Sequence, residues 1–293
     1  MNILLTGGTG FIGDTLVRFL LDEGHQVRIL TRENEVAPPF YTWNSTEINE
    51  KAFEDLDGII HLAGAPLMKR WTKKYKEEII SSRVDSANLL FNEVKRLKIP
   101  LKFFISAAGS SYYGQKTSDQ IFEESDEVGS DFLAEVCKLW EQAAFQFEEI
   151  GARVVCVRTP LVLAQHASAF QLMKRPTKYG LGACLGSGKQ WTTWIHLDDL
   201  CRIYVEAITN PNFFGAINVV SSDQMTHQDF MNQLAKALGT QIYMPSIPSP
   251  LVKLGMGEKA CLILEGARLS NQKLKQTGFQ FQYNQLDDFF QTL

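Results

Sequence analysis

Residues 4–16 read "LLTGGTGFIGDTL", in which Gly7, Gly10 and Gly13 stand between an apolar run and a helical pattern. In a strand-turn-helix unit the first glycine permits a tight turn and the second lets the backbone approach a pyrophosphate. The third glycine lets the helix pack closely on the strand. The N-terminus of such a helix offers free N–H groups and a partial positive charge to phosphates. This stretch therefore predicts a dinucleotide-binding turn.

Short apolar runs recur along the first two-thirds of the chain: "NILLTG", "QVRIL", "DGIIHLAG", "KFFISAA" and "RVVCVRT". Such runs are typical of strands that are buried on both faces. Helical patterns separate them over residues 11–23, about 70–98 and about 130–150. The second pattern is open to two interpretations, one helix or two, because "SSRVDS" is a weak helix former. The alternation predicts an α/β fold, a doubly wound and mostly parallel Rossmann-like sheet.

The regular alternation of predicted strands and helices ends after Arg158. A glycine-rich loop, "KYGLGACLGSGKQWTTW", precedes a helix in "IHLDDLCRIYVEAI" that we expect to begin at Asp198, and "GAINVVS" is expected to return as a strand. We expect a dinucleotide-binding domain over residues 1–160, rejoined by about 195–222. Residues 161–194 and 223–293 would form a smaller C-terminal lobe for a substrate.

Composition narrows the class of protein. The chain of 293 residues carries a net charge of −4 and has no long Lys/Arg tract, which gives no indication of nucleic-acid binding. No apolar run approaches the ~18 residues of a membrane span, and the N-terminus lacks the pattern of a signal peptide. The five scattered cysteines favour reduced thiols over a disulfide or zinc framework. A cytoplasmic protein with a small-molecule substrate is expected.

Two motifs carry a resemblance to a known family. The segments "TGGTGFIG" and "DGIIHLAG" resemble the extended short-chain dehydrogenase/reductase superfamily of sugar-nucleotide epimerases and dehydratases. Four further segments, "RWTKKYKEEIISSR", "SSYYG", "GSGKQWTTWIHLDDL" and "TGFQFQY", resemble its atypical epimerase-like subfamily, which includes the bacterial YfcH proteins and human SDR family 39U member 1. The resemblance runs over nearly the whole chain in order.

The end of the second strand bears on the cofactor. Thr31 and Arg32 stand where NAD-binding proteins usually place an acid for the ribose 2′-hydroxyl. A guanidinium suits a 2′-phosphate, so NADP(H) is the expected cofactor, although a solvated arginine at a strand end is the alternative. The resemblance implies that Glu78, Arg83 and Leu161 also face the cofactor, against the alternative of surface charges for the first two. The cofactor-binding residues expected are Gly7, Gly10, Phe11, Ile12, Gly13, Thr31, Arg32, Leu62, Ala63, Gly64, Glu78, Arg83 and Leu161.

The catalytic residues of the superfamily are incomplete here. Active members use a tyrosine as acid and base, with a lysine one helical turn later that lowers the phenol pKa. When Glu141 is set on the glutamate of that pattern, Leu133 takes the tyrosine position and Cys137 the lysine position. Ser106, after "FFI", and Tyr113, in the following loop, are the candidate catalytic residues that remain. Aromatic packing is the alternative for Tyr113.

Other polar and aromatic groups favour structural interpretations. "HLDD" resembles a metal cluster only superficially, so no metal is expected, and we interpret His196 as structural and Asp198 as a helix N-cap. His61 is expected in the core. The indoles of Trp191 and Trp194 either border the substrate crevice or pack in the interior.

Two functions stay open at this point. One is an NADP(H)-dependent epimerase/dehydratase-like oxidoreductase that acts on a small carbonyl, alcohol or sugar-like substrate. The other is a non-catalytic NADP(H)-binding sensor or regulatory protein, which the missing tyrosine-lysine pair favours. The glycine-rich loop and the separate lobe favour the first.

Overall fold

A parallel sheet organises the computed structural model, which describes residues 1–34 and 36–293. Its seven strands run in the order β11-β7-β5-β4-β1-β2-β3, and every neighbouring pair is parallel. The strands are β1 (Asn2–Thr6), β2 (Gln26–Thr31), β3 (Phe40–Thr42), β4 (Gly58–His61), β5 (Phe103–Gly109), β7 (Arg153–Thr159) and β11 (Gly215–Asn218). The inner strands consist mainly of apolar residues that are buried on both faces of the sheet. This agrees with the sequence prediction of helical crossover connections, because such helices cover both faces.

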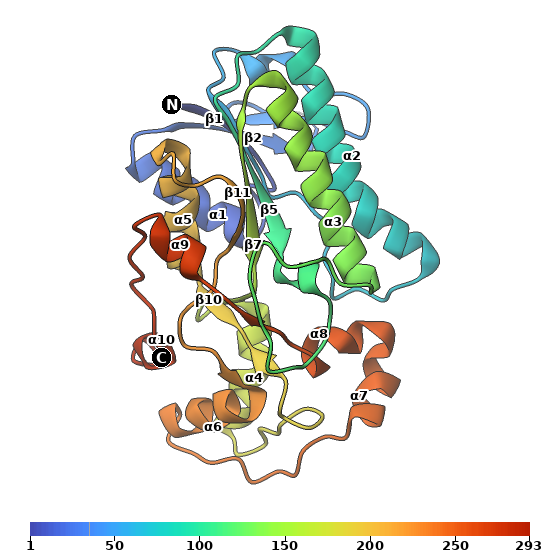
Figure 1. The fold of residues 1–293 in the computed structure, drawn as a ribbon, viewed down its shortest axis with the longest axis vertical. Helices are drawn as coiled ribbons and strands as arrows, with labels where there is room; N and C mark the ends of the chain where they lie inside the picture. Colours follow the sequence, from blue (N-terminus) through green and yellow to red (C-terminus); the bar gives the residue numbers. More distant parts are fainter. Residues whose placement is uncertain (35) are drawn as a thin grey trace.

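Helices cover both faces of this sheet. Helices α1 (Phe11–Asp22) and α5 (Leu197–Thr209) pack together on one face, and α2 (Lys73–Leu97) and α3 (Phe132–Phe145) pack together on the other (Figure 1). Residues 73–97 form one helix, so the two-helix alternative for this segment is wrong. Its buried side chains include Ile79, Leu90 and Val94, and their burial against the sheet layer outweighs the weak propensity of "SSRVDS".

The sequence analysis did not predict strand β3. Its residues, "FYT", form no buried apolar run, because all three are only half-buried at the edge of the sheet. The pairing Leu30↔Tyr41 joins it to β2. Pairing with β2 therefore makes this segment a strand, although its hydrophobic pattern does not predict one.

Most of the remaining strands and helices lie beyond the carboxyl ends of the strands (Figure 1). Short strands pair there as β8 (Leu161–Leu163) with β10 (Trp194–His196), β9 (Trp191–Thr192) with β12 (Met225–Thr226), and β6 (Ile121–Phe122) with β13 (Arg268–Leu269). The helices of this region include α4 (Ser168–Lys178), α6 (His227–Ala237), α7 (Ser249–Met256), α8 (Cys261–Leu264) and α10 (Leu286–Phe290). Helix α9 (Gln272–Gln276) instead packs beside β11. In open α/β sheets, ligands bind outside the carboxyl ends of the strands, which this region covers.

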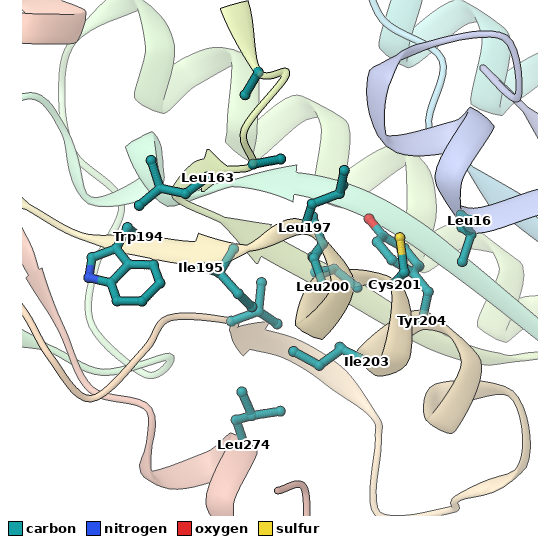
Figure 2. Close-up of a cluster of buried hydrophobic side chains, with 14 of the residues drawn as sticks. Leu16, Leu163, Trp194, Ile195, Leu197, Leu200, Cys201, Ile203, Tyr204 and Leu274 are labelled. Carbon is teal, nitrogen blue, oxygen red and sulfur yellow. The ribbon is translucent and has the colours of Figure 1, made fainter. Parts of the chain in front are cut away.

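One buried cluster joins the sheet to the C-terminal region. It contains Ile3 and Ile105 of the sheet together with Phe230 of α6 and Phe289 of α10. Figure 2 shows part of it, with the Trp194 indole beside Leu163. This cluster ties part of the C-terminal region to the sheet, while Val252, Ala260 and Leu264 form a small cluster of their own. Among residues 1–34 and 36–293, no helix combines the length and apolar character needed to cross a membrane.

Candidate cofactor and substrate site

The glycine turn, residues 7–13, joins β1 to α1. Gly7 has a φ of +71°, which favours glycine, and a Cβ on Gly13 would lie 2.2 Å from the Gly7 carbonyl oxygen. Gly10 is the N-cap and supplies no side-chain cap. In the part of the chain that the structure describes, no protein group accepts a hydrogen bond from the first-turn amides of Phe11, Ile12 and Gly13. The helix therefore presents bare donors at its positive end, an arrangement suited to a phosphate.

The β4 turn, residues 62–64, lies against the glycine turn. A Cβ on Gly7 would lie 2.9 Å from the carbonyl carbon of Leu62. The Thr6 hydroxyl oxygen accepts hydrogen bonds from the amides of Leu62 and Ala63, each at 3.1 Å. These bonds fix the two turns side by side, as expected for residues that line one cofactor crevice.

His61 holds this junction from inside the core. With both lone pairs of the Thr6 hydroxyl engaged by amides, its proton points to Nδ1 of His61, 2.8 Å away. Nε2 then carries the ring proton and donates toward the carbonyl of Arg83 at 3.3 Å. Burial lowers the pKa of His61 to about 4, in agreement with a neutral imidazole. The interpretation of His61 as a core histidine agrees with its complete burial.

The end of β2 lies beside the glycine turn, since Leu30 pairs with Thr6. Thr31 is buried, and its hydroxyl accepts the amide of Glu33 at 3.2 Å. Arg32 is exposed, and within residues 1–34 and 36–293 no carboxylate forms an ion pair with it. The end of β2 therefore carries a guanidinium that is exposed and unpaired within the described ranges.

Arg83 packs beneath the β4 turn. Its guanidinium donates to the carbonyls of Ile79 and Ala65, at 2.9 and 3.1 Å, and lies 4.9 Å from the centre of the Trp140 ring. A Cβ on Gly64 would lie 2.9 Å from its Cζ atom, so the guanidinium packs directly against the backbone of this glycine. Burial lowers the pKa of Arg83 below its ordinary value. Arg83 thus lies buried against the β4 turn with donors bound to protein carbonyls, and Glu78 is exposed on α2.

The tyrosine and lysine positions of the superfamily pattern are filled by apolar groups. Leu133 and Cys137 of α3 are buried, and a Cβ on Gly109 would lie 2.9 Å from the Cys137 sulfur. Burial raises the pKa of Cys137 to about 12, which rules against a thiolate nucleophile. Lys138, the next residue after Cys137, is exposed, and its Nζ lies 3.9 Å from Oε2 of Glu135, which is also exposed.

The structure corrects the orientation expected for Tyr113. Its side chain is buried rather than facing the crevice, and its hydroxyl donates to Oδ1 of Asn218 at 2.8 Å and accepts from Arg158 at 2.7 Å. Arg158 also binds Glu141 with two bonds, of 2.7 and 2.9 Å. Burial raises the pKa of the Tyr113 phenol, although Arg158 partly opposes this. Tyr113 therefore has the interior, packed position that was the alternative to a catalytic role.

These bonds form one buried network of four residues, Tyr113, Glu141, Arg158 and Asn218. The sequence analysis did not identify Arg158 and Asn218 as functional residues. Arg158 and Asn218 stand at or next to the ends of β7 and β11. The sequence signal available was a polar residue closing an apolar run, in "RVVCVRT" and "GAIN". Arg158 also stacks on Tyr112, with its Cζ 3.6 Å from the ring centre.

Ser106 also lies elsewhere than expected. Strand β5 continues to Gly109, so Ser106 sits within the sheet, between His61 of β4 and Cys156 of β7. Its hydroxyl is fully buried and donates to the carbonyl of Ala107 at 2.9 Å. Because β5 continues through "SAAG", the Ser106 hydroxyl lies in the interior and is not an exposed group at the end of the strand.

Three residues of the segment after β7 were considered in the sequence analysis. Leu161 is half-buried at the start of β8, beyond the end of β7. Trp194 is fully buried among apolar side chains (Figure 2), and its Nε1 donates to the carbonyl of Asp223 at 2.7 Å, so the interior alternative describes it. The N-cap of α5 is His196, which accepts the Asp198 amide at 3.2 Å, so the assignment of that cap to Asp198 is wrong. Within the described ranges, no group of three or more His, Cys, Asp or Glu side chains is arranged to hold a metal ion.

Comparison with known proteins agrees with this geometry. The model of the NAD dependent epimerase/dehydratase family matches residues 3–220, and that of a domain of unknown function, DUF1731, matches residues 247–293. The epimerase family protein SSP1921 of Staphylococcus saprophyticus is 34% identical over 288 residues, which cover 97% of this chain and 96% of that protein.

Two solved structures share the fold over nearly the whole chain. The human epimerase family protein SDR39U1 (isoform 2), crystallised with NADPH, superposes with a TM-score of 0.88 at 28% identity and covers 100% of this chain and 98% of its own. A nucleoside-diphosphate sugar epimerase from Corynebacterium glutamicum superposes with a TM-score of 0.80 at 29% identity, covering 98% of this chain and 56% of its own.

Proposed function

Since the chain belongs to the NAD dependent epimerase/dehydratase family, we propose that it binds NADP(H) and acts as an oxidoreductase on a small carbonyl, alcohol or sugar-like substrate. One observation supports the cofactor assignment above the others. The bare amides at the start of α1 lie beside a strand end that presents Arg32 where a carboxylate would favour NAD. The NADPH in the similar human protein agrees with this choice.

The described residues fit a dinucleotide in a defined order. The amides of residues 11–13 would hold the pyrophosphate, and Arg32 with Thr31 would hold the adenosine 2′-phosphate. The β4 turn, with Arg83 beneath it, would form the wall further along the crevice. The cofactor, when bound, supplies a hydride to the substrate carbon or accepts one from it.

Titration of the two nicotinamide cofactors tests this assignment. Loss of a charge-assisted phosphate contact costs about 1.5–3 kcal/mol, so Arg32→Ala should weaken NADPH binding roughly ten- to a hundredfold. NADH affinity should stay the same, because NADH has no 2′-phosphate. Arg175→Ala, which removes an exposed charge from α4, is the matched control. Equal affinities of the unaltered protein for NADPH and NADH would contradict the assignment.

The second candidate, a non-catalytic NADP(H)-binding sensor, has a specific observation in its favour. Hydride transfer to a carbonyl needs a proton donor within hydrogen-bond reach of the new alkoxide. Leu133 and Cys137 replace the usual pair, and the hydroxyls of Ser106 and Tyr113 are engaged in the interior. Incubation of the NADPH-loaded protein with aldehydes, ketones and oxidised sugars separates the two candidates. Consumption of reduced nicotinamide supports the enzyme, whereas tight NADPH binding with no consumption supports the sensor.

A further inference from the structure

Two short segments of the C-terminal region expose many apolar side chains. Fourteen large apolar side chains are exposed in the described part of the chain, and seven of them belong to residues 179–181 and 243–254. We refer to these two segments together as the α7 surface. The connection from α6 to α7 runs along the lower end of the molecule, far from α1 and the glycine turn (Figure 1). The α7 surface is therefore distinct from the candidate cofactor site.

The two segments of the α7 surface lie side by side. The amide of Ile247 donates to the carbonyl of Cys184, and the carbonyl of Ile247 accepts the amide of Gly186, each at 2.8 Å. A Cβ on Gly180 would lie 3.5 Å from the Tyr243 ring. Exposed apolar side chains from segments that are distant in the sequence thus gather in one place. A gathering of this kind indicates a surface that another molecule covers.

Helix α7 turns one face inward and leaves another uncovered. Val252 is buried in a small cluster with Ala260 and Leu264. Leu251 and Leu254, three residues apart and therefore neighbours on the helix surface, are 59% and 84% exposed. Because burial is what makes a leucine stabilising, these two side chains contribute little to the stability of the chain alone.

The chain around the α7 surface is strongly basic. Residues 160–197 and 230–257 contain no Asp or Glu, although the whole chain has a net charge of −4. Lys178 directly precedes the exposed Tyr179, and Lys253 directly precedes Leu254, so cations border the apolar side chains. No ion pair within the described ranges involves any of the six basic residues of these stretches: Lys174, Arg175, Lys178, Lys189, Lys236 and Lys253.

Two acidic residues that border residues 230–257 are engaged elsewhere. The Asp229 carboxylate accepts a hydrogen bond from the Thr226 hydroxyl at 2.6 Å, at the start of α6. Glu258 forms an ion pair with Lys76 of α2. Neither carboxylate pairs with a base of the α7 surface, so the positive charge there is available to an external partner.

Charge and apolar character together select the kind of partner. In a two-fold contact between copies of the chain, this basic surface would face itself, and like charges repel. A bilayer with anionic lipids offers negative headgroups to the cations and an apolar layer to the leucines. The rings of Tyr179 and Tyr243, which are 76% and 70% exposed, are amphipathic groups suited to the level of the headgroups.

We propose that the α7 surface attaches the protein peripherally to a membrane that contains anionic lipids. Leu251 and Leu254 enter the boundary between headgroups and acyl chains, and Lys178 and Lys253 contact the headgroups. The attachment goes beyond the proposed function, since it uses none of the residues assigned to the cofactor.

Cosedimentation of the protein with lipid vesicles tests the proposal. The probes are vesicles of phosphatidylcholine alone and vesicles of equal parts of phosphatidylcholine and phosphatidylserine. The protein should pellet with the second kind and stay in solution with the first, and added salt should weaken the binding because it screens the headgroup charge. Absence of binding to the phosphatidylserine vesicles, or equal binding to both kinds, would overturn the proposal.

A variant without two of the charges tests the basic residues. Lys178→Gln/Lys253→Gln should weaken binding to the phosphatidylserine vesicles roughly tenfold or more, because each base near an anionic surface strengthens binding severalfold. Lys51→Gln removes an exposed base outside the α7 surface and is the matched control, which should bind like the unaltered protein. Binding that is equal in the double variant and in the control would refute the electrostatic part of the proposal.

A second double variant tests the leucines. Leu251→Gln/Leu254→Gln should weaken vesicle binding roughly tenfold or more, because less apolar surface enters the membrane. Leu21→Gln changes an exposed leucine of α1 and is the matched control, which should leave the binding unchanged. Full binding by the double variant would show that α7 does not enter the membrane and would overturn the proposal.

Thermal unfolding and light scattering without vesicles separate the membrane from other roles of the same leucines. Because both side chains are exposed, the Tm of Leu251→Gln/Leu254→Gln should stay the same or rise. A marked fall in Tm would assign the leucines to the fold and overturn the proposal. A stable dimer of the unaltered protein that this variant converts to a monomer would assign the surface to a second copy instead.

Discussion

The two sides of the sheet edge differ in how their polar groups are satisfied. On the glycine-turn side, the first-turn amides of α1 and the Arg32 guanidinium have no acceptors in the described chain. On the α3 side, Arg158 binds Glu141, Tyr113 and the Glu124 carbonyl, so its donors are used within the protein. On the first side these donors are suited to a phosphate. On the second side, Tyr113, Glu141, Arg158 and Asn218 bond to one another in the interior, beside the Leu133 and Cys137 that fill the tyrosine and lysine positions of the family pattern.

The strongest test of this contrast removes one partner of the buried pair. Glu141→Gln leaves the Arg158 guanidinium buried without its counter-ion, and such a loss costs about 3–5 kcal/mol. Chemical denaturation should show a fall of that size in the free energy of unfolding. The folded fraction should still bind NADPH as before. The double variant Glu141→Leu/Arg158→Met is the control, and it should recover most of the stability because no charge is left unpaired.

Gly13→Ala tests the open side. A Cβ at this position would lie 2.2 Å from the Gly7 carbonyl oxygen, so the turn must shift, at a cost of about 1–3 kcal/mol. Because the same turn positions the phosphate-binding amides, NADPH affinity should fall together with the Tm. Gly255→Ala is a suitable control, since a Cβ there meets no atom within 4 Å. An unchanged NADPH affinity in folded Gly13→Ala would break the link between this turn and the cofactor.

His61 should make stability depend on pH. Its pKa is lowered to about 4 in the folded protein by burial, so the unfolded chain binds the extra proton first as pH falls. Stability is then fully present above the unfolded pKa of about 6.5 and decreases by about 2 kcal/mol between pH 7 and pH 5. Denaturation at several pH values should show a shallower decline in His61→Gln over this window. An identical slope in both proteins would contradict the neutral state assigned to His61 in the folded protein.

Tyr113→Phe should have the smallest effect. The change removes one hydroxyl from the buried network and leaves Oδ1 of Asn218 without its donor, which costs about 1–2 kcal/mol of stability. NADPH affinity should not change, and any turnover that is found should persist, because the hydroxyl faces the interior. Turnover abolished in a folded Tyr113→Phe protein would restore Tyr113 to the mechanism and show that the network opens during the reaction.

Sequence reasoning succeeded where local chemistry dictates geometry. A glycine with positive φ at Gly7 and a close approach at Gly13 follow from the spacing of "GGTGFIG" after an apolar strand. The same local logic predicts buried parallel strands from their Ile- and Val-rich runs. It failed for Asp198, since the short segment "IHLDD" offers three side chains able to cap a helix and only the backbone path selects His196.

The sequence by itself determined a Rossmann-like sheet, its glycine turn and the arginine at the end of the second strand, because each depends on residues that are close together along the chain. Only the tertiary structure decided that Tyr113, Glu141, Arg158 and Asn218 form one buried network, since these groups come from four separate elements. Contacts between distant segments depend on how whole helices and strands pack together. The spacing of residues along the chain does not predict that packing.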